Sequence, residues 1–424
     1  MVKKLLLVFF PIVAAAQGYT SYFTGNPTNI TTTPEFGVCM MGGATEHDNA
    51  MIWLLEKANG GDVVVLRSSG SNGYNDYLYS ELGVDVNSVE TLVITSVAGA
   101  TNPYVLDKVA NAEMIWFAGG DQWNYVSFFK DNALEDLLNA HVNIKQAPIG
   151  GTSAGMAILG GKYYSAQNGT ISSTQATNNP FHANMTIGQD DFLQIPLLAN
   201  VITDTHYDNP DRRGRHAAFL ARLKVNNSRV FGIACNEYVA VCIGTDGIAR
   251  VFGDYPAYEE FAYFIQSNCN LATDSVPEVC APNTPLTWDF DGQALQVYKV
   301  PGTMHGSNFF NITDWNSGSG GSWQDWSVQS ASLVGVNAVA PQCELGIADF
   351  ADDIVLSPVP FRDYFAIAGI TGARVSVYDV QGRVVYEKDH DDAISIETSE
   401  FPSGLYLISI EKDGKILNKK AVKN

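Results

Sequence analysis

A serine lies in a glycine-rich hexapeptide at residues 150–155, which reads Gly-Gly-Thr-Ser-Ala-Gly. The apolar run 147–149 precedes it, and residues 156–159, of helix-forming composition, follow it. We therefore expect a strand, a tight turn and a helix, with Ser153 at the turn, where glycines permit the unusual backbone angles of such an elbow. The elbow exposes the hydroxyl beside the free N–H groups of the helix, as nucleophilic catalysis requires. A glycine-rich turn that cradles a phosphate is the alternative.

A nucleophilic serine needs a base, and the base needs an orienting group. Among seven histidines, His206 is the one that follows a strand-like run, 201–204, and precedes a loop. Ligands of parallel sheets bind beyond the carboxyl ends of the strands. His216 lies among arginines, whose charge disfavours a protonated imidazole. Glu237 follows the apolar run 230–235 and is the candidate third member of a triad.

Two further features near these residues suit binding. Arg212 and Arg215 lie in a helical stretch after His206, in a chain with only 25 lysines and arginines, and their clustering favours a carboxylate ligand over a solvated helix face. The pair Gly119-Gly120 would bring backbone N–H groups close to a ligand, as an oxyanion hole demands. A simple tight turn is the competing interpretation of that pair.

The elements that position these residues follow an alternating α/β pattern from residue 36 onwards. Continuous apolar runs about 25 residues apart indicate parallel strands covered by helices on both faces. The expected strands are 36–40, 62–66, 91–94 and 114–117, and the expected helices are 47–58, 103–111 and 123–139. Gly42-Gly43, Gly119-Gly120 and Ser153 then share one edge of the sheet, although Gly42-Gly43 has less claim on chemistry.

Composition limits the class of protein. The chain has 424 residues, enough for two or three units, and its formal charge of −20 argues against surfaces for nucleic acid or anionic lipid. Residues 1–16 combine a basic start, a short apolar run and three alanines, which predicts a signal peptide that leaves Gln17 as the new N-terminus. A membrane anchor is the alternative, but the run is shorter than the roughly 20 residues of a span.

Cysteines and histidines indicate no metal site and no cofactor. In an exported protein a Cys269–Cys280 disulfide is plausible, Cys280–Cys343 is the competing pair, and the sequence leaves the choice open. Three other cysteines lie in apolar strands and are expected to be buried thiols: Cys39, Cys235 and Cys242.

The C-terminal stretch reads as a separate unit. An acidic linker with prolines, 346–360, precedes alternating strands separated by turn signals, which predicts a small antiparallel β-sandwich over 361–424. The expected strands are 374–379, 382–386, 394–396 and 404–410. A binding module or a spacer is the default interpretation of such a unit.

Four motifs together resemble the cyanophycinase type of peptidase family S51, which includes aspartyl dipeptidases. They are residues 151–155, residues 117–122, Asp204-Thr205-His206 with the arginines after it, and Glu237; the loop 165–173 adds to the likeness. The resemblance covers roughly residues 36 to 255. It implies a three-layer αβα fold like that of class I glutamine amidotransferases, of the flavodoxin-like kind with a mostly parallel sheet, within a catalytic domain at 17–345.

The resemblance also implies roles for individual residues. Ser153 would be the nucleophile, His206 the base and Glu237 its orienting group, with N–H groups at Gly120 and Ala154 forming the oxyanion hole. Substrate-binding positions would be Gln122, Asp204, Thr205, Arg212 and Arg215. Thr205 replaces the glutamine usual in cyanophycinases, and the loop to the arginines is longer, which bears on specificity. In an α/β-hydrolase the acid would precede the histidine, and His305 would be the better base.

The expected function is therefore that of a secreted serine exopeptidase that hydrolyses aspartyl peptide bonds, such as those of cyanophycin, to β-Asp-Arg dipeptides. Another aspartyl or isoaspartyl dipeptidase is the first alternative. A non-catalytic exported binding protein on the same fold is the alternative from a different class. The expected partner is a peptide or a polyaspartate-type polymer, without nucleic acid or a membrane span, and a homodimer remains open.

The C-terminal unit carries a second resemblance. The patterns Val-Tyr-Asp-Val-Gln-Gly-Arg at 377–383 and Phe-Pro-Ser-Gly-Leu-Tyr at 401–406, with a basic end, are similar to the C-terminal sorting domain of type IX secretion. This implies contact with that secretion machinery, delivery through the periplasm to the cell surface or the exterior, and removal of the unit. Its residues are then expected to have no part in catalysis.

Overall fold

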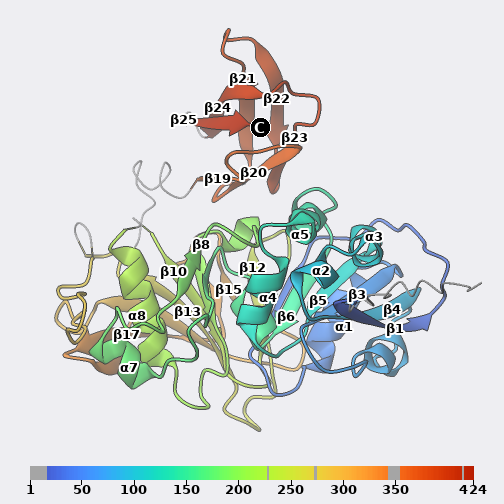
Figure 1. Cartoon of the computed structure of the whole chain (residues 1–424). Coiled ribbons are helices and arrows are strands. Elements are labelled where there is room, and N and C mark those ends of the chain that lie inside the picture. The colour runs from blue at the N-terminus through green and yellow to red at the C-terminus, as the bar shows by residue number, and fades with distance from the viewer. Residues whose placement is uncertain (1–16, 227–228, 272–274, 342–353, 413–414) are drawn as a thin grey trace, which may run out of the picture.

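The computed structural model describes residues 17–226, 229–271, 275–341, 354–412 and 415–424 (Figure 1). The expected signal peptide at 1–16 lies outside the described residues. Within them, no helix has the length and apolar character needed to span a bilayer. The same residues contain no group of three or more histidine, cysteine, aspartate or glutamate side chains arranged to hold a metal ion.

A ten-stranded mixed sheet forms one half of the main body. Its strands, in spatial order, are β1 (Tyr19–Gly25), β4 (Ser88–Ile94), β3 (Asp62–Arg67), β5 (Met114–Phe117), β6 (Ile149–Thr152), β2 (Val38–Met41), β11 (Ala240–Ile243), β12 (Ile248–Phe252), β15 (Asn308–Asn311) and β16 (Gly318–Ser319). The five central strands from β4 to β2 are mutually parallel, and the flanking strands are antiparallel. The predicted α/β class with a parallel centre is confirmed.

Helices cover both faces of the parallel centre. They include α1 (Asp48–Glu56), α2 (Val97–Ala100), α3 (Pro103–Asn111), α4 (Gln122–Phe129) and α5 (Ala133–Asn143). Along β3, Val64 and Leu66 face the core shared with α3 and α5, while Val63 and Val65 face the core shared with α1. Strands buried on both faces lack a polar face, which is why these segments read as continuous apolar runs.

The single helix predicted over 123–139 is wrong, because the chain forms α4 and α5 there. Asp131 adopts a positive φ of 61°, which ends one helix. The side chain of Asn132 then accepts a hydrogen bond from the backbone N–H of Leu134 at 3.0 Å and caps the next. A cap residue of this kind starts a new helix inside a sequence of helical composition.

A second, eight-stranded sheet forms the other half of the body and had no counterpart in the sequence-based expectation of one sheet. Its spatial order is β18 (Ser332–Asn337), β17 (Ser322–Gln329), β14 (Leu295–Pro301), β13 (Phe261–Ser267), β10 (Phe231–Cys235), β9 (Val201–Asp204), β7 (Lys162–Tyr164) and β8 (Ile187–Gln189). β9 runs parallel to β10, so their carboxyl ends lie side by side. The helices α7 (Ser173–Asn178) and α8 (Arg213–Lys224) contact each other beside this sheet.

The C-terminal unit is an antiparallel β-sandwich, as predicted. One sheet contains β19 (Val355–Ser357), β20 (Tyr364–Ala368) and β23 (Ile394–Glu397), and the other contains β22 (Val384–His390), β21 (Ala373–Tyr378), β24 (Gly404–Lys412) and β25 (Lys415–Lys423). Phe365, Val375 and Ile408 belong to the core between them. β19 lies inside the segment expected to be a linker.

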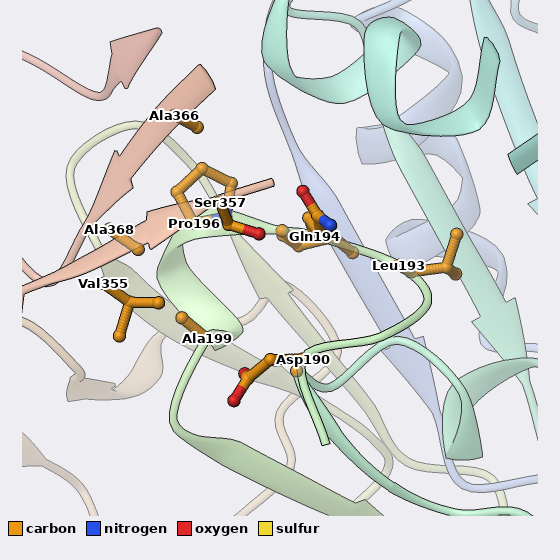
Figure 2. Close-up of a pocket in the computed structure, with 11 residues that line it drawn as sticks. Asp190, Leu193, Gln194, Pro196, Ala199, Val355, Ser357, Ala366 and Ala368 are labelled. Carbon is orange, nitrogen blue, oxygen red and sulfur yellow. The ribbon is translucent and has the colours of Figure 1, made fainter. Parts of the chain in front are cut away.

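A small apolar pocket lies where this unit meets the main body. Figure 2 shows side chains of the loop that contains the 3₁₀ turn Pro196–Leu198 beside those of β19 and β20, among them Ala199, Val355 and Ala366. None of the residues that line the pocket is a predicted site residue, so the pocket is separate from the candidate active site.

Both expected disulfide pairings are wrong, because Cys280 is a free thiol. Cys269 is disulfide-bonded and lies beside the side chain of Gln296 on β14, with its Sγ 3.3 Å from Oε1. Cys280 instead packs against a separate apolar cluster, near the Arg222 guanidinium. The three remaining cysteines of the prediction are free and buried, as expected: Cys39, Cys235 and Cys242.

Candidate active site

Ser153 lies on a sharp elbow between β6 and the short helix α6 (Ala154–Ala157). Its φ and ψ of 52° and −116° are unusual for a residue with a side chain, and its N–H donates to the Met41 carbonyl at 3.0 Å. The neighbouring glycines leave no room for side chains: a Cβ on Gly151 would lie 2.6 Å from the Gly155 carbonyl carbon, and one on Gly155 would lie 2.2 Å from the Phe117 oxygen. The elbow predicted from the glycine pattern is therefore formed.

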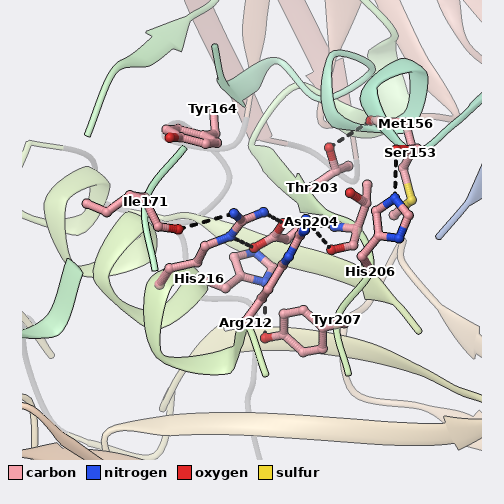
Figure 3. A network of polar contacts seen from close by, with 12 residues as sticks. Ser153, Met156, Tyr164, Ile171, Thr203, Asp204, His206, Tyr207, Arg212 and His216 are labelled. Carbon is pink, nitrogen blue, oxygen red and sulfur yellow. Dashed lines mark hydrogen bonds and ion pairs between the residues drawn. The ribbon is translucent and has the colours of Figure 1, made fainter. Parts of the chain in front are cut away.

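The structure brings Ser153, His206 and Glu237 into one hydrogen-bonded chain. Ser153 Oγ lies 2.7 Å from His206 Nε2, and His206 Nδ1 lies 2.6 Å from Glu237 Oε1. Figure 3 shows the serine and histidine facing each other. His206 follows β9 and Glu237 follows β10, which are parallel neighbours, whereas Ser153 comes from the other sheet. The site therefore lies where the carboxyl ends of strands from two sheets meet.

Gly42 and Gly43, which follow β2, contact His206. The N–H of His206 donates to the Gly42 carbonyl at 2.8 Å, and a Cβ on Gly43 would lie 2.3 Å from Cε1 of the imidazole. His206 itself has a positive φ of 47°. The sequence analysis gave this glycine pair less claim on chemistry than Gly119-Gly120. The signal in the sequence, a glycine pair directly after a strand, is the same for both pairs.

Glu237 is held by more than the histidine. Its second oxygen accepts a hydrogen bond from Asn209 Nδ2 at 3.3 Å, and its N–H donates to Asp208 Oδ1 at 3.1 Å. The hydrogen bond from His206 lowers the pKa of Glu237, since it stabilises the carboxylate form. An ionised Glu237 accepts the Nδ1 proton, which leaves Nε2 free to accept the proton of Ser153. Sequence reasoning did not identify Asn209.

Two backbone N–H groups belong to segments next to Ser153, the loop after β5 and the start of α6. Gly120 has a φ of +134°, and a Cβ on Gly119 would lie 3.4 Å from Ser153 Cβ, so the loop after β5 passes directly beside the nucleophile. Within the described residues, neither the Gly120 N–H nor the Ala154 N–H at the start of α6 has a hydrogen-bond acceptor. Unpaired donors beside a nucleophile have the arrangement of an oxyanion hole.

Asp204 and Arg215, both expected to hold substrate, are engaged with each other. Arg215 Nε donates to Asp204 Oδ2 at 2.8 Å and Nη2 to Oδ1 at 2.5 Å, and Arg215 is 4% and Asp204 3% exposed. Burial raises the pKa of Asp204, but the adjacent guanidinium outweighs it, so the pKa falls below its ordinary value. Buried charges need partners. The pair therefore ties β9 to α8, two residues before His206, rather than presenting free charges to a ligand.

The remaining expected substrate residues are Arg212, Thr205 and Gln122. Arg212 Nη1 donates to the Thr205 carbonyl at 3.0 Å, and within the described residues Arg212 forms no ion pair. Burial, and then the charge of Arg215, lower the pKa of Arg212. Thr205 is buried and its N–H donates to Asp204 Oδ1, while Gln122 Nε2 donates to the Tyr164 carbonyl at 3.3 Å.

His216 is excluded as the base by its position as well as its charge environment. It is fully buried, with Nε2 3.2 Å from the Ile202 carbonyl and Nδ1 3.2 Å from the Tyr207 hydroxyl. Burial lowers the pKa of His216 to about 4, and Arg215 adds to the effect. The imidazole therefore serves as a neutral hydrogen-bonding group in the core.

Two family models match parts of this chain. Residues 74–251 match the model of peptidase family S51, and residues 356–424 match the model of a secretion system C-terminal sorting domain. Both resemblances inferred from the motifs are confirmed. The sorting domain indicates export to the cell surface or the extracellular space.

The matched relatives are cyanophycinases. That of Synechococcus elongatus is 26% identical over 180 residues, which cover 42% of this chain and 50% of the relative. That of Geminocystis herdmanii is 27% identical over 177 residues, covering 42% and 58%, and that of Trichormus variabilis is 25% identical over 210 residues, covering 50% and 62%. The chain thus spans about half to three fifths of the length of these relatives.

Two solved structures give partial matches to this chain. A peptidase from an acI-B1 Actinobacterium has a TM-score of 0.40 at 15% identity, covering 52% of this chain and 89% of its own. A putative peptidase E protein from Listeria monocytogenes has a TM-score of 0.33 at 16% identity, covering 49% and 94%.

Proposed function

We propose that this protein is an exported serine peptidase that cleaves aspartyl peptides by acyl transfer, with Ser153 as nucleophile, His206 as base and Glu237 as orienting group. The observation that carries the proposal is the unbroken chain of short hydrogen bonds, 2.7 Å and 2.6 Å, through these three side chains. The elbow at Ser153 and the match to peptidase family S51 support the same reaction class.

The geometry fits a two-step mechanism. Ser153 Oγ attacks the peptide carbonyl while His206 Nε2 takes its proton, and ionised Glu237 stabilises the imidazolium. The N–H groups of Gly120 and Ala154 stabilise the oxyanion of the tetrahedral intermediate. The intermediate collapses as the imidazolium gives its proton to the leaving amine. Water, deprotonated by His206, then attacks the acyl-enzyme, and the second tetrahedral intermediate expels Ser153, which regains its proton.

Arg212 is the residue that we propose for substrate selection. Its guanidinium donates to the carbonyl of Thr205, the residue before His206. The side chain is half-buried, and its other N–H donors remain free for a carboxylate. An aspartyl carboxylate is the ligand that such a cation would hold, and cyanophycin, an arginine-bearing aspartate polymer, is the first substrate to test because the matched relatives carry that name. Thr205 and Gln122 would line the same site.

Two alternatives remain within the proposal. Thr205, which stands where cyanophycinases usually have glutamine, favours a different aspartyl or isoaspartyl dipeptidase. A non-catalytic binding protein on the same fold is the other, and the formed hydrogen-bonded chain at Ser153 argues against it. We further propose that residues 1–16 are removed as a signal peptide, that 17–345 form the catalytic domain, and that 361–424 engage the type IX machinery.

The test is release of soluble dipeptide from insoluble cyanophycin by residues 17–345 and by the full chain, beside Ser153→Ala and Arg212→Met. We expect clearing by the wild type, none by Ser153→Ala, and a KM at least about tenfold higher for Arg212→Met. No clearing by the wild type sinks the cyanophycin assignment, and a panel of α- and β-aspartyl dipeptides then tests the alternative. A fluorophosphonate that fails to label Ser153 contradicts the hydrolase itself.

A further inference from the structure

We infer that Tyr125, a buried residue of α4, is the positioning residue that turns the backbone N–H groups of Gly119 and Gly120 towards Ser153. The inference deepens the proposed function and rests on it, because it assigns what holds the oxyanion site in shape. Tyr125 has no place in the predicted site and does not touch the nucleophile, so it acts only through the glycine loop.

The Tyr125 hydroxyl reaches three carbonyl oxygens at the ends of β3 and β5. It lies 2.5 Å from Ala118 O, 3.2 Å from Leu66 O and 3.4 Å from Gly119 O. A hydroxyl has one proton, so its main hydrogen bond is the shortest one, to Ala118. Burial raises the pKa of Tyr125, so the phenol stays protonated and remains a donor.

The two peptide units between residues 118 and 120 thus direct their carbonyl oxygens to the same hydroxyl. In a trans peptide the C=O and the following N–H point in opposite directions. The N–H groups of Gly119 and Gly120 therefore both point away from Tyr125. Neither has an acceptor within the described residues, and successive N–H groups that point to one side form an anion-binding concavity.

Ser153 lies next to this loop. A Cβ built on Gly119 would be 3.4 Å from Ser153 Cβ and 3.8 Å from its Oγ. The positive φ of Gly120, +134°, is open to glycine and strained for other residues, and glycine is also the residue with the most conformational freedom to lose. The buried Tyr125 hydroxyl, by holding the carbonyl oxygens, fixes a loop conformation that the glycines by themselves do not fix.

The ring of Tyr125 has a packing role that the hydroxyl does not share. It packs edge-on against two phenylalanine rings, with 5.7 Å between the ring centroids for Phe117 and 5.5 Å for Phe129. A phenylalanine at position 125 would keep both contacts. A hydroxyl buried in an apolar core costs free energy unless it is hydrogen-bonded. Tyr125→Phe therefore removes the anchor and leaves the packing in place.

The experiment compares Tyr125→Phe with a matched control, Tyr163→Phe. The Tyr163 hydroxyl is also on a largely buried residue and donates to Asp191 at 2.9 Å, outside the proposed machinery. A fluorophosphonate reacts with the serine and places a phosphoryl oxygen in the oxyanion site, so kinact and KI are measured by mass of the labelled protein. Ser153→Ala shows the background, and rates are normalised to the folded fraction by near-UV circular dichroism.

We expect Tyr125→Phe to lower kinact by about 10- to 100-fold with KI unchanged, since deletion of a whole oxyanion donor costs about 10²–10³. Tyr163→Phe should stay within twofold of wild type, although its melting temperature also falls. A kinact of Tyr125→Phe within twofold of wild type overturns the inference. If wild type and Ser153→Ala are labelled alike, the proposed function fails and the inference falls with it, an outcome distinct from the preceding one.

Discussion

Gly43→Ala tests whether the loop after β2 places the base. A Cβ at this position would lie 2.3 Å from His206 Cε1 and 2.5 Å from Nε2, whereas ordinary van der Waals contact begins near 3.4 Å. The imidazole must therefore move by about 1 Å, which stretches the 2.7 Å contact with Ser153 Oγ beyond hydrogen-bonding distance. A displacement of that size costs about 100-fold in rate, or about 2.7 kcal/mol in activation free energy.

The same substitution also strains the backbone, so the control must carry that strain alone. Gly43 has a φ of +119°, and Gly83 has a φ of +70° with nothing within 4 Å of an added Cβ. Gly83→Ala should lose about 1 kcal/mol of stability and keep its rate. The assay is kcat on the cleaved substrate together with the fluorophosphonate labelling rate of Ser153, both on protein shown to be folded. A folded Gly43→Ala that works at more than half the wild-type rate refutes the role assigned to the glycine.

Two further predictions concern stability. Asp204→Asn leaves the Arg215 guanidinium buried without a counter-charge, and we expect urea unfolding to show a loss of about 3–5 kcal/mol in the free energy of unfolding. The double variant Asp204→Leu/Arg215→Met should recover part of that loss. An unchanged urea midpoint for Asp204→Asn would contradict the buried pair. Burial lowers the pKa of His141 and of His216 to about 4. Between pH 6.5 and 4 the unfolded chain therefore binds more protons than the folded chain, so the free energy of unfolding falls as the pH falls. The expected loss at pH 4.5 is about 2–3 kcal/mol for each histidine. Urea titrations at pH 7 and 4.5 that give equal free energies would rule this out.

Much of the parallel half of the fold could be predicted because local signals and tertiary demands agree there. β5 (Met114–Phe117), α3 (Pro103–Asn111) and β9 (Val201–Asp204) begin and end at the predicted residues. Strands that are buried on both faces need apolar residues throughout, and a proline or an asparagine cap marks the start of a helix. The glycine pair after β5 lies beside Ser153 and the pair after β2 lies beside His206, as strand order in a parallel sheet allows.

The second sheet and the fate of the charges could not be predicted in the same way. The antiparallel strands of the region 261–337 pair with partners fixed by register across loops, and no local pattern encodes which strand lies beside β10. Asp204 and Arg215 read as a free acid and a free base because their separation of eleven residues hides the 2.5 Å contact between them. Likewise, spacing alone suggested a disulfide at Cys280, which the fold leaves as a thiol.

The sequence by itself determined the three candidates for the proposed triad, Ser153, His206 and Glu237, because each follows an apolar run predicted to be a strand, and ligands of parallel sheets bind beyond the carboxyl ends of the strands. It also determined the sandwich at the C-terminus, whose alternating strands and turns are local signals. Only the tertiary structure decided that Ser153 approaches His206 from a different sheet, that Gly43 supports the imidazole, and that Tyr125 anchors the glycine loop. These are contacts between segments far apart in the chain, and they depend on packing that no local propensity specifies.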